Sequence, residues 1–327
     1  MSYKTDLQKK YIQNDKFDLF PPIEDCVLKI EVTNICNHSC IFCPHQKQKR
    51  KMGIIDEKLA MRIIKEGADN NIKKLALFMN GEPFVVNNIA NYVRYAKSLG
   101  YEYVFITTNG SLATCEQISE VIDAGVDSIK FSINAGSRET YIKVHGKDHY
   151  NKAMTALQFA YDYRNQKKKA CRILVGFVVT DITRDEMVPQ YEKIKGMCDD
   201  LLFFKPDNFG GYMVQEYSSF YSEEINTNLP WYDFSDKKAP CTLINNSINV
   251  TYEGYLTLCC SETLNYLVVE DLNDMSLKDA WYSPRMTEIR IKHYNNDLKG
   301  TQCYVCMNNI MAPVVPFRED LYNKSLK

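Results

Sequence analysis

The sequence predicts an α/β protein, a partial (β/α)6 barrel followed by a small C-terminal domain that contains a β-hairpin. Strand-like and helix-like stretches alternate six times between residues 26 and 211. Several strand-like stretches are almost continuously apolar, which is typical of parallel strands buried on both faces. In the last third of the chain, cysteines frame an alternating segment of the kind that forms a hairpin.

The expected elements follow from the apolar pattern and from the residues that end each stretch. We expect strands at 26–33, 73–80, 102–108, 128–133, 172–180 and 200–205, and helices near 57–69, 86–99, 114–124, 148–167 and 184–196. Asp56, Thr114 and Thr183 are candidate N-caps, and Gly100 and Gly125 lie where a helix would stop. Eight β–α repeats would close a barrel, whereas six leave it open and curved. Functional loops then gather at the C-terminal ends of the strands.

The chain divides into five expected segments. They are an N-terminal arm (1–25), the partial barrel (26–211), a linker (212–240), a second cysteine-containing domain (241–312) and a tail (313–327).

Composition excludes several classes of protein. The chain has 327 residues, of which 45% are hydrophobic and 25% charged, and its net charge of −1 does not indicate a nucleic-acid binder. Its first residues are polar, with no signal peptide, and no apolar run approaches the ~20 residues that span a bilayer. We therefore expect a cytoplasmic protein with no membrane partner. Its twelve cysteines should then stay reduced, and their clustering indicates metal binding.

Three of these cysteines lie on one loop directly after the first expected strand. Cys36, Cys40 and Cys43 are spaced C-x3-C-x2-C. Three thiolates can bind three corners of a cubane iron–sulfur cluster, whereas ordinary clusters use four cysteines. The fourth iron keeps an open position, where chemistry takes place. The alternatives are a zinc site, which prefers four ligands in C-x2-C pairs, or three unrelated buried cysteines.

With Phe42 just before the third cysteine, this loop resembles that of the radical S-adenosylmethionine (SAM) enzymes. The resemblance implies a partial barrel and a [4Fe–4S] cluster whose fourth iron is chelated by SAM. One-electron cleavage of SAM then yields a 5′-deoxyadenosyl radical that abstracts hydrogen from a substrate. It also implies an electron donor such as flavodoxin or ferredoxin.

Three further segments resemble SAM-binding motifs of this family. Asn80-Gly81-Glu82-Pro83 is similar to its Gly-Gly-Glu-Pro motif, with Asn80 in place of the first glycine, and Thr108-Asn109 follows the third strand. Each could instead be a plain turn. Ser132 and Asn134 end the fourth strand, where the family contacts ribose, and His145 follows. Asn134 replaces the usual Asp and His145 the usual Arg. The alternative for His145 is an exposed position on a surface helix.

A basic run follows the cysteine loop and has two interpretations. Most such runs form a solvated face. The alternative is that this run receives an anionic group of the substrate. Its charged residues are Lys47, Lys49, Arg50 and Lys51.

A second set of four cysteines predicts another metal site. Residues 247–258 alternate around Glu253-Gly254, so they are expected to form a hairpin that brings Cys241 and Cys259 together. Cys303 and Cys306 form a C-x2-C pair. Four such ligands suit zinc or an iron–sulfur cluster. The layout resembles the SPASM/twitch group of radical SAM proteins, in its short form with one auxiliary cluster. This implies two [4Fe–4S] clusters in the chain.

Cys260 adjoins Cys259, and neighbouring side chains on a strand face opposite ways. It is therefore either a core thiol or a donor of a hydrogen atom to a substrate radical.

Three functions remain open at the level of sequence. The first is oxidation or epimerisation of a small polar substrate such as a sugar or aminocyclitol, with the auxiliary cluster as electron acceptor. The second is peptide modification, although an arm of 25 residues is too short to fold as a leader-binding domain. The third is a non-catalytic iron–sulfur protein for electron transfer or sensing.

Overall fold

A single ten-stranded sheet organises the molecule. The structure is a computed structural model that describes residues 18–222, 229, 231–232 and 240–327, so most of the expected N-terminal arm lies outside the described residues. The strand order is β10-β9-β8-β1-β2-β3-β4-β5-β6-β7. The parallel strands of the barrel are β1 (Val27–Ile30), β2 (Lys74–Ala76), β3 (Tyr103–Thr108), β4 (Ser128–Ser132), β5 (Arg172–Val178) and β6 (Asp200–Phe204).

All six expected barrel strands are present, but β1 and β2 are much shorter than their apolar runs, and the prediction of a strand at 26–33 is wrong beyond Ile30. The prediction of a strand at 73–80 is wrong beyond Ala76. From there the chain turns toward the cysteine loop, where the Glu82 amide donates to the Ile35 carbonyl over 2.8 Å. An apolar run marks packing rather than a strand ladder, and here Phe78 lines the cavity described below and packs on Phe105 of β3, with 5.6 Å between ring centroids.

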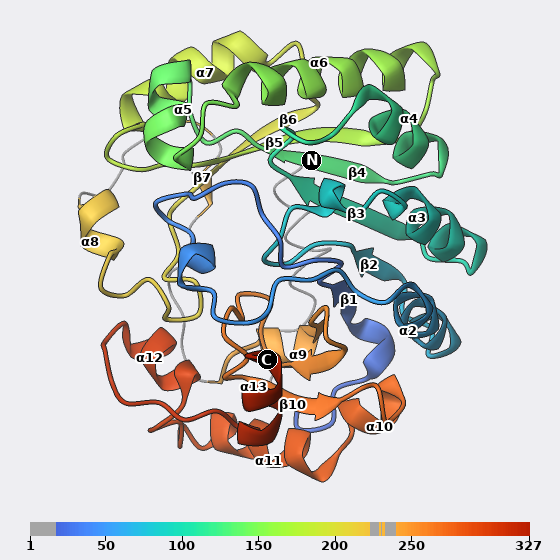
Figure 1. Cartoon of the computed structure of the whole chain (residues 1–327), viewed down its shortest axis with the longest axis vertical. Coiled ribbons are helices and arrows are strands. Elements are labelled where there is room, and N and C mark those ends of the chain that lie inside the picture. Colours follow the sequence, from blue (N-terminus) through green and yellow to red (C-terminus); the bar gives the residue numbers. More distant parts are fainter. Residues whose placement is uncertain (1–17, 223–228, 230, 233–239) are drawn as a thin grey trace.

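Helices cover the outer face of the curved sheet (Figure 1). They are α2 (Glu57–Asp69), α3 (Ile89–Ser98), α4 (Cys115–Asp123), α6 (Tyr150–Gln166) and α7 (Met187–Ile194). Asp56 accepts a hydrogen bond from the Leu59 amide, and Thr114 forms a capping box with Gln117, so both predicted N-caps are confirmed. The prediction for Thr183 is wrong, since its hydroxyl accepts from the Thr180 amide and caps no helix.

One helix was not among those expected. α5 (Arg138–His145) is a short helix between β4 and α6, and it ends at Gly146 in a left-handed conformation with φ +66°. The Ser39 amide donates to the His145 carbonyl and the Ile41 amide to that of Val144. The end of α5 therefore holds the cysteine loop by its backbone.

The C-terminal hairpin continues the barrel sheet. β8 (Ser247–Val250) and β9 (Tyr255–Thr257) are antiparallel, which confirms the predicted hairpin, and β10 (Val268–Asp271) extends it. β8 also pairs in parallel with β1, from Val27 opposite Ser247 to Ile30 opposite Val250. At the other edge, β7 (Trp231–Tyr232), inside the expected linker, pairs with β6. Strands from before, within and after the expected linker therefore belong to one sheet.

At the opposite end of the view from α6 lie α10 (Leu277–Trp281) and α11 (Pro284–Tyr294), with the other helices of the C-terminal part above them (Figure 1). Trp281 is the largest fully buried side chain of the described residues, and its indole N–H donates to the Pro21 carbonyl over 3.0 Å. None of the helices in the described ranges has the length and apolarity needed to cross a bilayer. The helices of this part, with the short α8 beside the barrel, are α8 (Tyr217–Phe220), α9 (Leu243–Asn246), α10 (Leu277–Trp281), α11 (Pro284–Tyr294), α12 (Gln302–Asn308) and α13 (Glu319–Ser325).

Candidate functional site

The three cysteines after β1 line a cavity of about 280 Å³ at the C-terminal ends of the barrel strands. Every predicted SAM-binding residue except Pro83 lines the same cavity. Pro83 instead begins a short 3-10 turn, Pro83–Val85, and is buried. The predicted residues around the cavity are Cys36, Cys40, Phe42, Cys43, Asn80, Gly81, Glu82, Thr108, Asn109, Ser132, Asn134 and His145.

The chemistry of the three thiols fits a metal cluster. Burial raises the pKa of Cys36 to about 12 and also raises the pKa of Cys40 and Cys43. Each thiol is therefore neutral on its own, and only a bound cation would stabilise the thiolate that ligates metal. Three sulfurs from one loop around one cavity are the donor set of a cluster with one iron left open.

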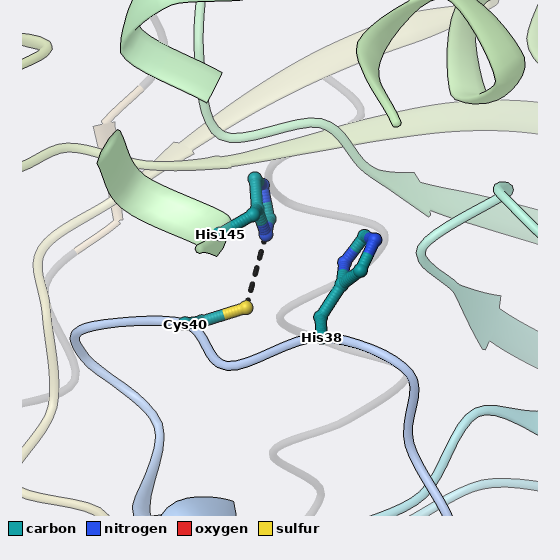
Figure 2. Close-up of side chains that lie close together, drawn as sticks. All are labelled: His38, Cys40 and His145. Atoms are coloured by element: carbon teal, nitrogen blue, oxygen red, sulfur yellow. Dashed lines mark hydrogen bonds between the residues drawn. The ribbon is translucent and has the colours of Figure 1, made fainter. Parts of the chain in front are cut away.

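Cys40 also lies against two histidines (Figure 2). The His145 Nε2–H donates to the Ile133 carbonyl over 2.9 Å, so its Nδ1, 2.9 Å from the Cys40 sulfur, accepts from the thiol. His145 is 1% exposed, so its alternative placement on a surface helix is wrong. His38, Cys40 and His145 place ligand atoms within 4.8 Å of one another and could hold a single metal ion. That ion and a cluster would compete for the same sulfur.

Glu82 is a structural anchor as well as a cavity residue. Its carboxylate is 2% exposed and accepts from the Thr108 hydroxyl over 2.6 Å and from the Asn109 amide over 2.7 Å. Burial raises its pKa, and these hydrogen bonds counteract that rise. The loops after β2 and β3 are thereby tied together. Asn109 in turn donates to the Asn37 side chain of the cysteine loop over 2.8 Å.

Two of the three substituted positions of the family motifs, Asn80 and Asn134, have structural explanations. The Asn80 amide donates to Glu31 over 2.9 Å and also to the Glu262 carbonyl, so it joins the barrel to the C-terminal part. Asn134 has φ +54°, a conformation that Asn tolerates better than most residues, and accepts from the Val178 amide over 2.8 Å.

Sequence reasoning missed several residues of the cavity. Lys130 lies two positions before Ser132 on β4, so the alternation of a strand places both on the inner face. That signal was available in the sequence. The other missed residues lie on strands and loops that reach the cavity only because the sheet is curved. The missed residues are His38, Phe78, Met79, Thr107, Lys130, Gly176, Val178, Phe204 and Phe209.

The second set of cysteines also converges on one pocket. Cys241, Cys259, Cys303 and Cys306 line a pocket of about 30 Å³ whose other walls are mostly apolar. Four thiols in an apolar enclosure fit a closed metal site.

Cys260 is not among the residues that line this pocket. A hydrogen bond with the Cys259 thiol, together with the charge of Lys29 and a hydrogen bond from it, lowers the pKa of Cys260. Cys260 therefore lies close to β1, which carries Lys29.

Two residues of the basic run are already paired with carboxylates. Arg50 is 3% exposed and bridges Glu31 and Glu253, with Arg50 Nη2 2.6 Å from Glu253 Oε2. Lys47 pairs with Glu216 over 2.6 Å. Because Arg50 is buried, the prediction that it belongs to a solvated face is wrong.

Comparison with known families identifies the class of protein. Residues 30–188 match the model of the radical SAM superfamily, and residues 241–307 match that of the SPASM family, described as an iron–sulfur cluster-binding domain. Together the two matches span most of the chain. The chain therefore belongs to the radical SAM superfamily and carries a SPASM/twitch region. Its cofactors include SAM and iron–sulfur clusters.

Among curated proteins, the chain is 31% identical over 166 residues to one described as a probable GTP 3′,8-cyclase from Saccharolobus islandicus. The match covers 51% of this chain and 51% of that protein, so the chain spans about half the length of such relatives.

Two solved structures share the fold. BtrN in complex with AdoMet and 2-DOIA has a TM-score of 0.55 and 18% identity, covering 86% of this chain and 91% of BtrN. SuiB from Streptococcus suis, bound to its precursor peptide SuiA, has a TM-score of 0.66 and 15% identity, covering 96% of this chain and 78% of SuiB. At these identities the likeness concerns the fold alone.

Proposed function

We propose that this protein is a radical SAM oxidoreductase or epimerase that abstracts a hydrogen atom from a small polar substrate such as a sugar or aminocyclitol. The proposal rests on the observation that this chain has two cysteine sites of different kinds. Three cysteines line an open cavity, and four line an enclosed apolar pocket. Bound SAM and the open cluster would supply a 5′-deoxyadenosyl radical, and a second [4Fe–4S] cluster would accept an electron.

The residues of the cavity would position and shield this chemistry. Cys36, Cys40 and Cys43 would hold the cluster, and the Glu82-anchored loops would place SAM against it. Phe78, Phe204 and Val178 give the cavity apolar walls, which exclude water from a reactive radical. An electron donor such as flavodoxin or ferredoxin would reduce the cluster, and the expected location is the cytoplasm.

Peptide modification is the second candidate. SuiB, whose structure contains its precursor peptide, is covered over 78% of its length by this chain, whereas BtrN is covered over 91%. A structure of anSMEcpe with bound AdoMet and a peptide is covered over 95% of its length, so match of length does not separate the two substrate classes.

The direct test is anaerobic incubation of the reconstituted protein with SAM and dithionite. We expect 5′-deoxyadenosine from the native protein and none from the variant in which Cys36, Cys40 and Cys43 are replaced by Ala. A Cys115→Ala variant, in which an exposed cysteine at the start of α4 is lost, should match the native protein. A native protein with full iron content that forms no 5′-deoxyadenosine would contradict radical chemistry.

Turnover in deuterated water separates the two outcomes. Epimerisation through Cys260 would place one deuterium on the inverted carbon of the product, and Cys260→Ala would abolish inversion. Oxidation would place no deuterium there.

A further inference from the structure

One lysine lines the cavity, and a second lies near it. Lys130 on β4 lines the 280 Å³ cavity, with its Nζ 5.2 Å from the centre of the Phe204 ring. Gly176 on the next strand lies beside it, and a Cβ there would be in ordinary contact with the Lys130 side chain at 3.5 Å. Lys29 on β1 lies near enough to repel it.

These lysines have no carboxylate partner within the parts of the chain that the structure describes. Lys130 contacts the Phe204 ring, and Lys29 lies near enough to Cys260 to lower the pKa of its thiol. Burial, followed by the charge of Lys29, lowers the pKa of Lys130 to about 8. Placing the Lys130 ammonium group in the cavity beside a ring and with no carboxylate partner among the described residues is unfavourable, although the nearby Cys260 thiol raises its pKa in part. An anion in the cavity would relieve that cost.

We infer that Lys130, with Lys29 beside it, binds an oxyanion of the substrate, either a phosphate or a carboxylate group. The inference rests on the proposed function, because it assigns a chemical class to the substrate of that site. It makes the substrate anionic and excludes a purely cationic aminocyclitol. The bound anion would hold the rest of the molecule toward the cysteine loop.

The test is anaerobic calorimetry on the reconstituted, SAM-bound full chain, with inorganic phosphate and acetate as probes. We expect at least one of them to bind, and the tighter of the two identifies the group. Lys130→Gln should weaken binding at least tenfold, while Lys130→Arg should retain it. Lys152→Gln, on the outer surface of α6, is the matched control and should bind as the native protein does.

Three results would overturn the anion site. They are no binding of either anion, equal binding by Lys130→Gln, or loss of binding when SAM is added, which would assign the lysines to the SAM carboxylate. Formation of 5′-deoxyadenosine is measured separately and without added anion. Failure of the anion site and failure of radical chemistry therefore give different results.

A separate observation concerns the auxiliary pocket. His293 on α11 is 0% exposed and lines the same pocket as the four cysteines. Neither of its ring nitrogens has a hydrogen-bond partner among the described residues. An imidazole ring carries at least one N–H whether it is neutral or charged.

A buried N–H without an acceptor costs free energy, and native proteins rarely leave one unpaired. The sulfurs of a cluster held by Cys241, Cys259, Cys303 and Cys306 are acceptors within the same pocket. Hydrogen bonds to cluster sulfurs help to set the reduction potential. We propose that His293 donates its N–H to a sulfur of the auxiliary cluster and thereby raises that potential.

The test is a redox titration of the reconstituted protein followed by electron paramagnetic resonance. In His293→Phe we expect the auxiliary cluster to become at least tenfold harder to reduce, a fall of about 59 mV for a one-electron couple. His293→Gln, which keeps a donor, should fall less. Ile291→Val, at an exposed position of the same helix, should leave the potential unchanged.

An unchanged potential in His293→Phe with full iron content would overturn the hydrogen bond. A directly coordinated nitrogen in the native spectrum would overturn it too, because His293 would then be a ligand. If His293→Phe assembles no auxiliary cluster, the potential of His293→Gln decides.

Discussion

Gly81 shows how single residues shape the SAM-binding side of the cavity. A Cβ at this position would lie 2.2 Å from the Thr33 carbonyl oxygen and 2.9 Å from that of Ile35. Both are backbone atoms of the loop that carries the cysteines. Only glycine lets the segment after β2 approach this loop so closely.

We predict that Gly81→Ala pushes these two loops apart. The expected result is at least tenfold weaker SAM binding in calorimetry and a loss of roughly 1–3 kcal/mol in the free energy of unfolding. Gly196→Ala is the control, since a Cβ there meets no atom within 4 Å. Native-like SAM affinity in Gly81→Ala would show that the close approach is dispensable.

At the scale of elements, Arg50 joins the cysteine loop to the C-terminal hairpin. It lies beyond the loop and bridges Glu31, next to β1, and Glu253, in the turn between β8 and β9. Burial alone would lower its pKa, but the two glutamates outweigh burial and raise it. The guanidinium is therefore charged at any working pH, and both carboxylates depend on it.

We predict that Arg50→Met destabilises the protein by roughly 3–5 kcal/mol, because it leaves Glu31 buried without its counter-ion. Urea unfolding measures the loss. Adding Glu31→Gln to Arg50→Met should recover part of it. Lys65→Met, which breaks an exposed pair with Asp69, is the control and should change nothing measurable. A small effect of Arg50→Met would mean that water reaches Glu31.

At the scale of the whole molecule, three buried histidines make stability depend on pH. Burial lowers the pKa of His38 to about 3 and the pKa values of His145 and His293 to about 4. In the unfolded chain a histidine titrates near 6.5. Below that pH the histidines of the unfolded state bind protons, whereas the buried histidines of the folded state stay neutral until the pH falls further. The stability of the folded state is therefore full above pH 6.5 and falls as the pH drops toward 4.

We predict that the free energy of unfolding of the cluster-free protein decreases from pH 7 to pH 4. His293→Phe should remove its share of that slope, about 3 kcal/mol. Urea unfolding at several pH values measures both. Carboxylates titrate in the same range, so the comparison between native and variant isolates the histidine. Parallel curves for the two proteins would contradict the buried neutral ring.

The sequence by itself determined the barrel strands, the hairpin and both groups of cysteines. These are local properties. Apolar runs mark buried strands, Glu253-Gly254 marks a turn, and thiol spacing marks a ligand set. The alternation along β4 is also a local property. It could have predicted that Lys130 shares the inner face with Ser132, two positions later.

Only the tertiary structure decided how these parts meet. No local pattern states that β8 pairs with β1, that Arg50 is buried between two glutamates, or that His293 faces four cysteines distant in sequence. Each depends on contacts between segments far apart along the chain. Such contacts arise when the folded chain brings apolar surfaces together and must then satisfy the charges and hydrogen bonds enclosed between them.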